Sequence, residues 1–378
     1  MDIVDILSRL VAFPSVVGLP NHAITDWIRA YAEEHGAVVT TLPGPEGDRS
    51  NLFVSVGPAE RHGYVLSGHM DVVPAAEAGW LGDPFTLRRE GDRLYGRGTS
   101  DMKGFLACAL AALPDLGRRT LARPLHIALS YDEEDGCRGV PHLIAALPGL
   151  CAPPLGCIVG EPSGLVPVRG HKGKAAARIA VRGRSGHSSR PDRGLNAIHA
   201  MTEVLTAAAG VAASCTAGPL DARFEPPHST VQVGRISGGE AVNVIPDLCT
   251  IEIEARAIAG VDPGALLASL EEVLATLRQR GFATEWEAMS AYPALALGAD
   301  APLAILVERL SGHRPLDAVS YGTEAGLFQA AGIDAIICGP GDIVRAHRPN
   351  EYIERRELEA CQRLIEGLIV TLSEDAAA

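Results

Sequence analysis

The stretch that decides the fold is YVLSGHMD, from Tyr64 to Asp71. It begins with the apolar residues of a buried strand and ends in His69 and Asp71, whose side chains are common metal ligands. Two further apolar runs end in acidic residues in the same way, Leu125–Glu134 and Cys157–Glu161. Because ligands gather at the carboxyl ends of strands in open α/β sheets, we expect these polar side chains to meet at one sheet edge.

Strand patterns alternate with helical patterns through the first 160 residues of the chain. The spacing of apolar residues over Ile24–Tyr31 predicts one helix, and the Ala- and Leu-rich stretch Met102–Leu113 predicts another. Strands that alternate with helices predict an α/β domain whose sheet is mixed, mostly parallel and covered on both faces.

The pattern changes at about Lys172, where Ala177–Val181, Thr230–Ile236 and Cys249–Arg256 alternate or nearly alternate between apolar and polar residues. Together with two long helical patterns, this predicts a smaller α+β unit with a partly open antiparallel sheet. The α/β pattern returns after about Pro293. We therefore expect one domain built from residues 1–171 and 290–378, and a second domain, residues 172–289, inserted within it.

The composition excludes several functional classes. The net charge of −13 argues against a nucleic-acid partner. Hydrophobic residues make up 47% of the chain but aromatic residues only 4%, and this composition favours an α/β core of Ala, Val, Leu and Ile. Eight cysteines without a CxxC pair and an acidic amphipathic start, MDIVDILSRL, predict reduced thiols and a cytoplasmic protein. No stretch approaches the roughly 20 continuous apolar residues that a spanning helix needs, so we expect no membrane segment.

Five side chains at the predicted strand ends and nearby loops suit a metal site. They are His69, Asp101, Glu134, Glu161 and His347. Imidazole and carboxylate ligands without thiolate are typical of a catalytic zinc, cobalt or manganese site. Five ligands exceed one tetrahedral centre with an open position, but they fit two metals that share a carboxylate. Two divalent ions are then balanced by three carboxylates and a bridging hydroxide, which leaves Glu133 able to hold a proton.

Each residue also has an ordinary structural interpretation when it is taken alone. A histidine at a strand end is more often structural, and Asp101 could be a helix N-cap. Glu133 and Glu134 could be a solvated pair, and Glu161 could be a turn residue. The successive spacings of 32, 33 and 27 residues between the first four candidates each match one βα unit, which favours the joint metal-site interpretation.

These residues resemble the metal-site pattern of the M20 family of metallopeptidases and amidohydrolases. The motifs that carry the resemblance are His69-x-Asp71, Asp101-Met-Lys-Gly, Glu133-Glu134, Gly160-Glu161-Pro-Ser163 and the late His347. They occur in order over nearly the whole chain. The resemblance implies a catalytic domain of the zinc-exopeptidase type with an inserted ferredoxin-like domain for substrate closure and dimerisation.

The resemblance also implies a role for each site residue and two Zn²⁺ per subunit, with Co²⁺ able to substitute. The implied ligand sets are His69, Asp101 and Glu161 for one metal, and Asp101, Glu134 and His347 for the other. Glu133 is the implied general base. Asp71 lies on the same side of an extended chain as His69, and we expect it to accept the second N–H of that imidazole.

The inserted domain carries a further part of the resemblance. The segment around His187 is similar to one whose histidine reaches an active site, commonly that of the partner subunit, and helps to hold the oxyanion; this implies a homodimer through the inserted domain. A surface-loop histidine is the alternative. The expected substrate contacts are Asn243, Arg256, Gly322, Thr323 and Glu324. An arginine fork matches a carboxylate, whereas Glu324 is equally explained as a helix N-terminal acid.

The segments Tyr321–Gly326, Cys338–Gly341 and Ala346–Glu351 look most like the acetylornithine deacetylase branch of the family. This implies hydrolysis of an N-acyl-L-amino acid, first of all N2-acetyl-L-ornithine to L-ornithine and acetate in arginine biosynthesis. The alternatives are succinyl-diaminopimelate desuccinylase, acetyl-diaminobutyrate or acetyl-citrulline deacetylase, a dipeptidase, or a metal-binding relative without catalysis. Glu133 argues against the last, because turnover needs it and metal binding does not.

Overall fold

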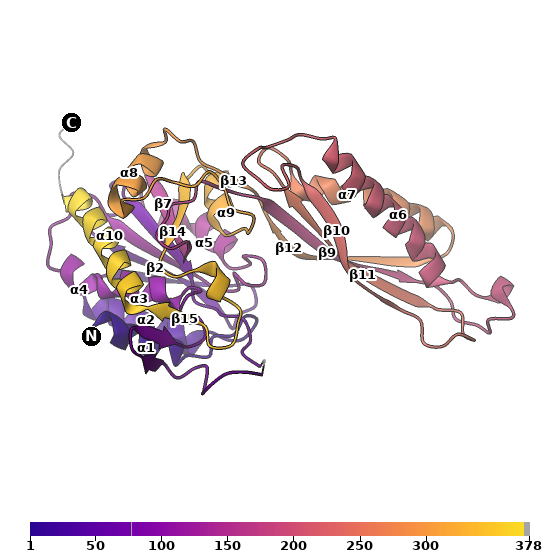
Figure 1. The fold of residues 1–378 in the computed structure, drawn as a ribbon, viewed down its shortest axis with the longest axis horizontal. Coiled ribbons are helices and arrows are strands. Elements are labelled where there is room, and N and C mark those ends of the chain that lie inside the picture. The colour runs from indigo at the N-terminus through magenta and orange to yellow at the C-terminus, as the bar shows by residue number, and fades with distance from the viewer. Residues whose placement is uncertain (77, 374–378) are drawn as a thin grey trace. The chain divides into compact units, whose positions relative to one another are not determined.

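The computed structural model describes residues 1–76 and 78–373, and its contacts divide the chain into two units. Among the described residues, the first unit contains Met1–Gly170, Ala296–Asp317 and the segment from Thr323 to Ser373, so it is built from separate parts of the chain (Figure 1). The second unit contains His171–Leu295 and Ala318–Gly322. The sequence places the second boundary at 289/290, whereas the contacts place it at 295/296 because a strand we did not expect, β12 (Ala283–Tyr292), belongs to the second unit.

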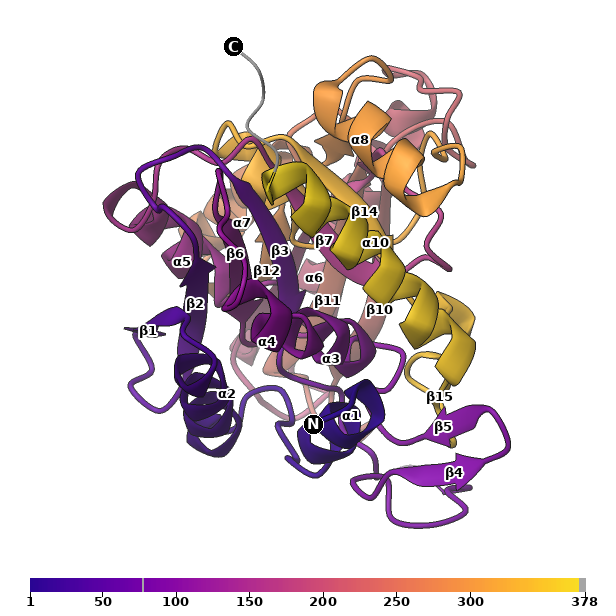
Figure 2. The same ribbon diagram turned by 90° about the vertical axis from the view of Figure 1, so that its left-hand side faces the viewer.

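The first unit is built on a six-stranded sheet of order β1-β2-β6-β3-β7-β14 (Figure 2). The strands β6, β3, β7 and β14 run parallel, while β1 and β2 add an antiparallel edge. This confirms the prediction of a mixed, mostly parallel sheet. The bounds are β1 Val38–Pro43, β2 Ser50–Val56, β3 Tyr64–His69, β6 Leu125–Ser130, β7 Gly156–Pro162 and β14 Ala335–Gly339.

Helices cover the sheet of the first unit. One core joins the sheet to α1 (Ile3–Val11), α2 (His22–Glu34), α3 (Lys103–Ala111), α8 (Pro302–Ser311) and α10 (Arg355–Ser373), and also to Leu113 and Leu116 that follow α3. The short helices α4 (Leu113–Leu116), α5 (Val140–Ala146) and α9 (Ala325–Ala330) complete the unit. Each fully buried leucine of this core contributes about 1.5–3 kcal/mol relative to an exposed one.

A small sheet of order β15-β5-β4 joins two distant parts of the first unit. Its strands are β4 (Arg88–Glu90), β5 (Arg93–Tyr95) and β15 (Tyr352–Glu354), and they pair antiparallel. The sheet therefore holds the chain just after residue 351 beside the chain just before residue 96.

The second unit has a four-stranded antiparallel sheet of order β10-β11-β9-β12 and two long helices. The bounds are β9 Gly173–Arg182, α6 Ala197–Thr216, β10 Thr230–Gly238, β11 Leu248–Ala257, α7 Pro263–Gln279 and β12 Ala283–Tyr292. Alternate residues of β11 are buried against α6 and α7, as its alternating sequence predicts. The sequence of β12 does not predict a strand, because it is an edge strand whose side chains are mostly exposed.

The helix α6 is long and apolar enough to cross a membrane by length and composition alone. Met201 and Val204 on its inner face are buried in the core of the second unit. The same composition is expected of a helix that packs on a sheet, so the core of this unit accounts for it.

Candidate metal centre and active site

The carboxyl ends of three parallel strands in the first unit carry the predicted ligands. His69 is the last residue of β3, Glu161 is the next-to-last residue of β7, and Glu133 and Glu134 follow β6. Asp101 lies two residues before α3. Because these strands are parallel neighbours, their ends meet at one sheet edge, as the sequence predicts.

Asp101 stands between the two histidines. Its Oδ1 is 3.1 Å from Nε2 of His69, and its Oδ2 is 3.3 Å from Nε2 of His347. Glu161 Oε1 is 3.7 Å from the same nitrogen of His69, and Glu134 Oε1 is 3.0 Å from Nε2 of His347. One carboxylate therefore presents an oxygen to each of two ligand groups, which is the geometry of a bridging ligand.

The electrostatics of the site favour cations. Burial raises the pKa of Glu161 well above its usual range, and the neighbouring charge of Asp101 raises it further. Burial also opposes ionisation of Asp101, but hydrogen bonds with His347 and His69 hold its pKa below the ordinary value. Hydrogen bonds with Asp101 and Glu134 raise the pKa of His347 to about 10. Crowded carboxylates beside imidazoles, without thiolate, fit two divalent ions of the zinc, cobalt or manganese kind.

Glu133 lies beside the ligands. One oxygen of Glu133 is within 4.8 Å of ligand atoms of His69 and Glu161. Burial raises the pKa of Glu133 to about 8, the charge of His69 lowers it in part, and Glu134 raises it again. A carboxyl group that takes up and releases a proton near neutral pH is suited to general acid–base catalysis.

Asp71 orients the site by a route that differs from the expected one. The Nδ1 of His69 is 2.9 Å from the main-chain oxygen of Asp71, whereas the carboxylate Oδ1 is 3.6 Å away. The carboxylate instead accepts the backbone N–H groups of Glu133, at 3.2 Å, and Glu134, at 3.1 Å. The tautomer of His69 is thus set by a backbone carbonyl, and the Asp71 carboxylate positions the two glutamates.

Of the residues expected to contact substrate, Glu324 and Thr323 belong to the first unit and are buried. Both oxygens of Glu324 accept serine hydroxyls, from Ser67 at 2.5 Å and from Ser130 at 2.7 Å. Thr323 Oγ1 accepts the backbone N–H of Ala325 at 3.1 Å. Sequence reasoning missed the two serines, although Ser67 lies two residues before His69 on the same side of β3, which is a local signal for its position.

The other expected substrate contacts belong to the second unit. Gly322 packs against the ring of Tyr292, where a Cβ would not fit. Arg256 near the end of β11 donates to Tyr292 Oη at 3.1 Å and to both carboxylate oxygens of Glu254, at 2.9 and 3.1 Å. Its guanidinium is therefore held in a fixed orientation by its neighbours.

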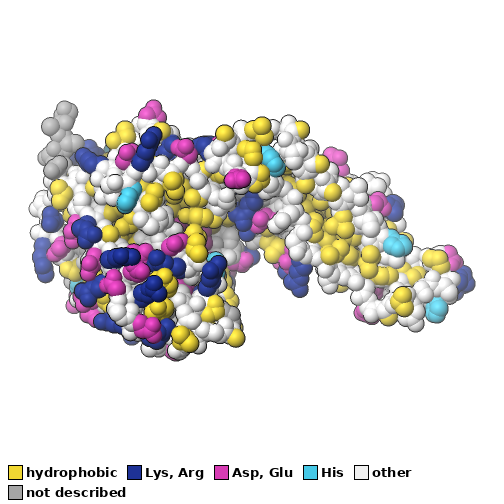
Figure 3. Space-filling view, in the orientation of Figure 1, with side chains coloured by type: hydrophobic (Ala, Val, Ile, Leu, Met, Phe, Trp, Pro, Cys, Tyr) yellow, Lys and Arg dark blue, Asp and Glu magenta, His cyan; other side chains and the backbone are white. Residues whose placement is uncertain are grey.

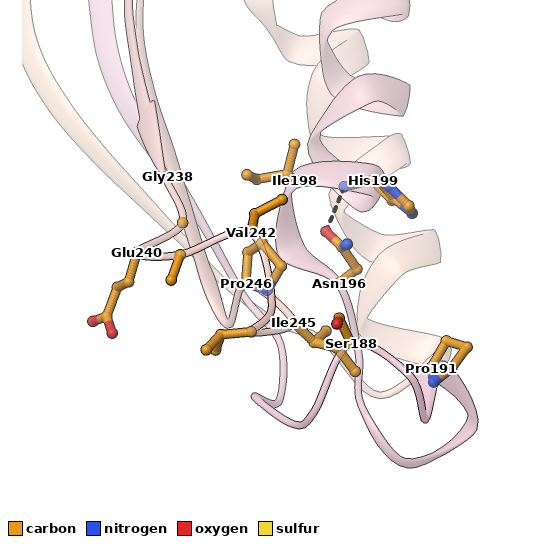
Figure 4. A pocket seen from close by; sticks show the side chains of 13 residues that line it. Ser188, Pro191, Asn196, Ile198, His199, Gly238, Glu240, Val242, Ile245 and Pro246 are labelled. Carbon is orange, nitrogen blue, oxygen red and sulfur yellow. Dashed lines mark hydrogen bonds between the residues drawn. The ribbon is translucent and has the colours of Figure 1, made fainter.

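His187 and Asn243 lie together in exposed loops of the second unit. His187 forms an isolated bridge with Val244, and the N–H of Ser188 donates to the carbonyl of Asn243 at 3.1 Å. A hollow of about 650 Å³ lies beside them (Figure 4). Its wall includes Asn196, whose Oδ1 accepts the N–H of His199 and caps α6.

The chain is similar to known proteins over nearly its whole length. Residues 65–371 match the model of peptidase family M20/M25/M40. The chain is 33% identical to an acetylornithine deacetylase of Pectobacterium carotovorum, and 34% identical to one of Klebsiella pneumoniae, over 97% of this chain and 96% of each relative. Its fold resembles an M20 family metallo-carboxypeptidase of Sulfolobus solfataricus, with a TM-score of 0.79, 18% identity and 99% of both chains covered. A tripeptidase of Staphylococcus aureus has a TM-score of 0.74 at 19% identity, covering 99% of this chain and 98% of that one. The chain therefore belongs to peptidase family M20/M25/M40 and is a metal-dependent hydrolase.

Proposed function

We propose that the protein hydrolyses the amide bond of an N-acyl-L-amino acid, with N2-acetyl-L-ornithine as the first candidate and ornithine and acetate as its products, a step of arginine biosynthesis. The observation that carries the reaction type is the Asp101 carboxylate between two ligand groups, with Glu133 beside them. The acetylornithine deacetylases that are 33–34% identical to this chain support the choice of substrate.

The residues present fit two Zn²⁺, and Co²⁺ has the same ligand preferences. His69, Asp101 and Glu161 would hold one ion, and Asp101, Glu134 and His347 the other. Ions bound there would lower the pKa of a water molecule and polarise the amide carbonyl.

Glu133 moves the proton in the proposed reaction. It takes one proton from the attacking water while the water oxygen bonds to the carbonyl carbon. It then delivers that proton to the nitrogen as the C–N bond breaks, so that a carboxylic acid and an amine leave, and the acid passes its remaining proton to the amine through water. The Asp71 carboxylate holds the backbone of Glu133 and keeps its side chain at the site.

The experiment that tests this proposal is an activity screen of the metal-reconstituted protein. The panel contains N2-acetyl-ornithine, acetyl-citrulline, acetyl-diaminobutyrate, succinyl-diaminopimelate, formyl amino acids and dipeptides, and released amine is measured with and without a chelator. We expect the highest kcat/KM for N2-acetyl-ornithine and no turnover after metal removal. Higher kcat/KM for a succinyl substrate or a dipeptide would reject the proposed substrate, and full activity in chelator would reject the mechanism.

We also propose a homodimer formed through the second unit. His187 lies beside Val244, before β11 begins, whereas Arg256 lies near the end of that strand. From Leu248 to Arg256 the strand rises about 27 Å, so one copy of this unit cannot place both His187 and Arg256 on one small substrate. Two copies can, if each supplies the other's His187.

The surface of the second unit suits such a contact. β10 lies at the edge of the sheet, beside α6. Ala209 and Ala213 of α6 are exposed and Leu205 is partly exposed, while Ile236 of β10 is 54% exposed. Figure 3 shows hydrophobic side chains gathered over this face. A twofold dimer would bury these residues and pair the free strand edge.

Subunit complementation tests the dimer. His187→Ala and Glu133→Gln should each be nearly inactive, and a 1:1 mixture that is allowed to exchange subunits should regain about a quarter of wild-type activity, since half of the dimers then contain one intact site. Sedimentation that shows only monomer, or a mixture that stays inactive although exchange is demonstrated, would reject the shared site.

We infer a cytoplasmic location from the eight cysteines, which are all free thiols. A reducing compartment keeps such thiols unpaired. Fractionation of cells that produce the protein, with thiol labelling of each fraction, tests this inference.

A further inference from the structure

We propose that Glu351 is a positioning residue of the metal centre: its buried carboxylate fixes the loop that presents Asp101 and ties that loop to the segment that carries His347. The proposal rests on the metal centre of the proposed function and is independent of which acyl amino acid is the substrate.

The carboxylate of Glu351 is enclosed by backbone donors from the Asp101 loop. Its Oε1 accepts the N–H of Ser100 at 2.9 Å and that of Asp101 itself at 3.0 Å, and its Oε2 accepts the N–H of Gly98 at 3.0 Å. Glu351 is only 1% exposed, so water does not replace these bonds. Three backbone N–H groups within four residues of the loop therefore depend on one side chain.

Arg97 supplies the positive charge for this carboxylate. Its Nη1 is 3.0 Å from Oε2 of Glu351, and the side chains of both residues are 1% exposed. Its Nη2 donates to the carbonyl of Pro74 at 3.1 Å, and its guanidinium lies 5.1 Å from the centre of the Trp80 ring. The ion pair thereby also fixes the loop that follows β3, the strand that ends in His69.

The backbone of Glu351 is anchored independently of its side chain. Tyr352 of β15 pairs with Tyr95 of β5, and the carbonyl of Glu351 accepts the N–H of Gly96 at 2.9 Å. The backbone that carries the carboxylate is thus held by the pairing of β15 with β5 as well as by the side-chain contacts. His347 lies only four residues earlier on the same segment.

Through these contacts Glu351 fixes the backbone of Asp101, the one residue that both ligand groups share. A small rotation of Asp101 would move its two oxygens in opposite directions relative to His69 and His347, and would weaken both groups together. Residues that orient metal ligands in this way typically change metal affinity or activity by about 10- to 100-fold when they are replaced.

The test compares Glu351→Gln with the control Asp221→Asn. Asp221, in the second unit, is likewise paired with an arginine and accepts a backbone N–H, both from Arg223. In Glu351→Gln the side-chain amide replaces one carboxylate oxygen with an NH₂ group. That NH₂ group must face a backbone N–H donor that contacts an oxygen in the wild-type protein. Metal-free protein of each variant is titrated with Co²⁺, and the visible absorption spectrum and the dissociation constants are recorded together with the melting temperature before metal is added.

We expect Glu351→Gln to bind Co²⁺ about 10- to 100-fold more weakly, with an altered absorption spectrum, while the control keeps the wild-type values. If Glu351→Gln does not fold, Glu351→Asp keeps the charge opposite Arg97 but shortens the side chain, and it should show the same change with a smaller amplitude. A lower melting temperature with unchanged Co²⁺ affinity and spectrum would overturn the proposal. Because Co²⁺ binding needs no substrate, wild-type protein that binds Co²⁺ but does not cleave N2-acetyl-ornithine would reject the proposed substrate and leave this test intact.

Discussion

Replacement of Glu133 by glutamine removes a proton carrier while it keeps the shape of the side chain. The thiol of Cys137 lies 3.3 Å from Oε1 of Glu133, and the backbone N–H that Asp71 accepts is unaffected. Loss of general acid–base catalysis typically costs 10²–10⁴-fold in rate, which is about 3 to 5 kcal/mol in the activation barrier. We expect kcat to fall by that factor, because burial has raised the pKa of this carboxyl to about 8, so that it can take up and release a proton near neutral pH.

The assay measures amine release under saturating substrate together with the metal content after gel filtration. We expect two metals per chain in both wild-type protein and Glu133→Gln. The matched control is Asp135→Asn, which removes a negative charge two residues along the chain from an exposed pair with Arg138. Exposed pairs contribute little, so the control should retain nearly full activity.

Two results would refute this reasoning. If Glu133→Gln retained wild-type kcat, another group would carry the proton. If it lost a metal, Glu133 would be a ligand, since one of its oxygens lies within 4.8 Å of ligand atoms of His69 and Glu161.

Three further predictions concern the site and its support. Asp101→Asn leaves one acceptor and one donor where two acceptors are needed. We therefore expect elemental analysis to find at most one bound metal per chain, and two bound metals would contradict a bridging role. Gly160→Ala would drive a Cβ into the ring of Phe105, and overpacking of this kind costs about 1–3 kcal/mol, measured as a lower denaturant midpoint; an unchanged midpoint would show that the ring moves freely. Burial raises the pKa of Asp71 to about 7 and of Glu133 to about 8. In metal-free protein the native state therefore keeps protons on these two carboxyl groups, whereas the unfolded chain releases them above about pH 4.5. These two groups should therefore make the melting temperature in chelator fall between pH 5 and pH 8, and a rise over that range would contradict the pKa directions.

The ligand positions could be predicted because the relevant information is local. An apolar run that stops abruptly at His69 or Glu161 marks both a buried strand and its carboxyl end, and parallel order brings such ends together. Asp101 follows from its place before an Ala- and Leu-rich helix. The edge strand β12 is missing from the prediction because its exposed side chains lack the apolar signal of a buried strand.

The supporting contacts could not be predicted in the same way. Glu351 bonds to loop residues about 250 positions earlier in the chain, and Glu324 bonds to Ser67 across 257 positions. Nothing near these residues in the sequence indicates such partners. Glu324 looks from its neighbours like a helix N-terminal acid, and only the packed structure shows both of its oxygens bound to serine hydroxyls.

The discontinuous first unit has a consequence for how the protein is made. Its core combines helix α3 with helix α10, and its metal centre combines His69 with His347. A ribosome that adds 5–20 residues per second needs about 10 to 35 seconds to travel from Gly170 to His347, because the whole second unit is synthesised in between. During that interval the apolar face that later receives α10 is exposed in the nascent chain. A newly made chain should therefore depend on chaperones at this stage, and it can acquire its full metal complement only after His347 has emerged.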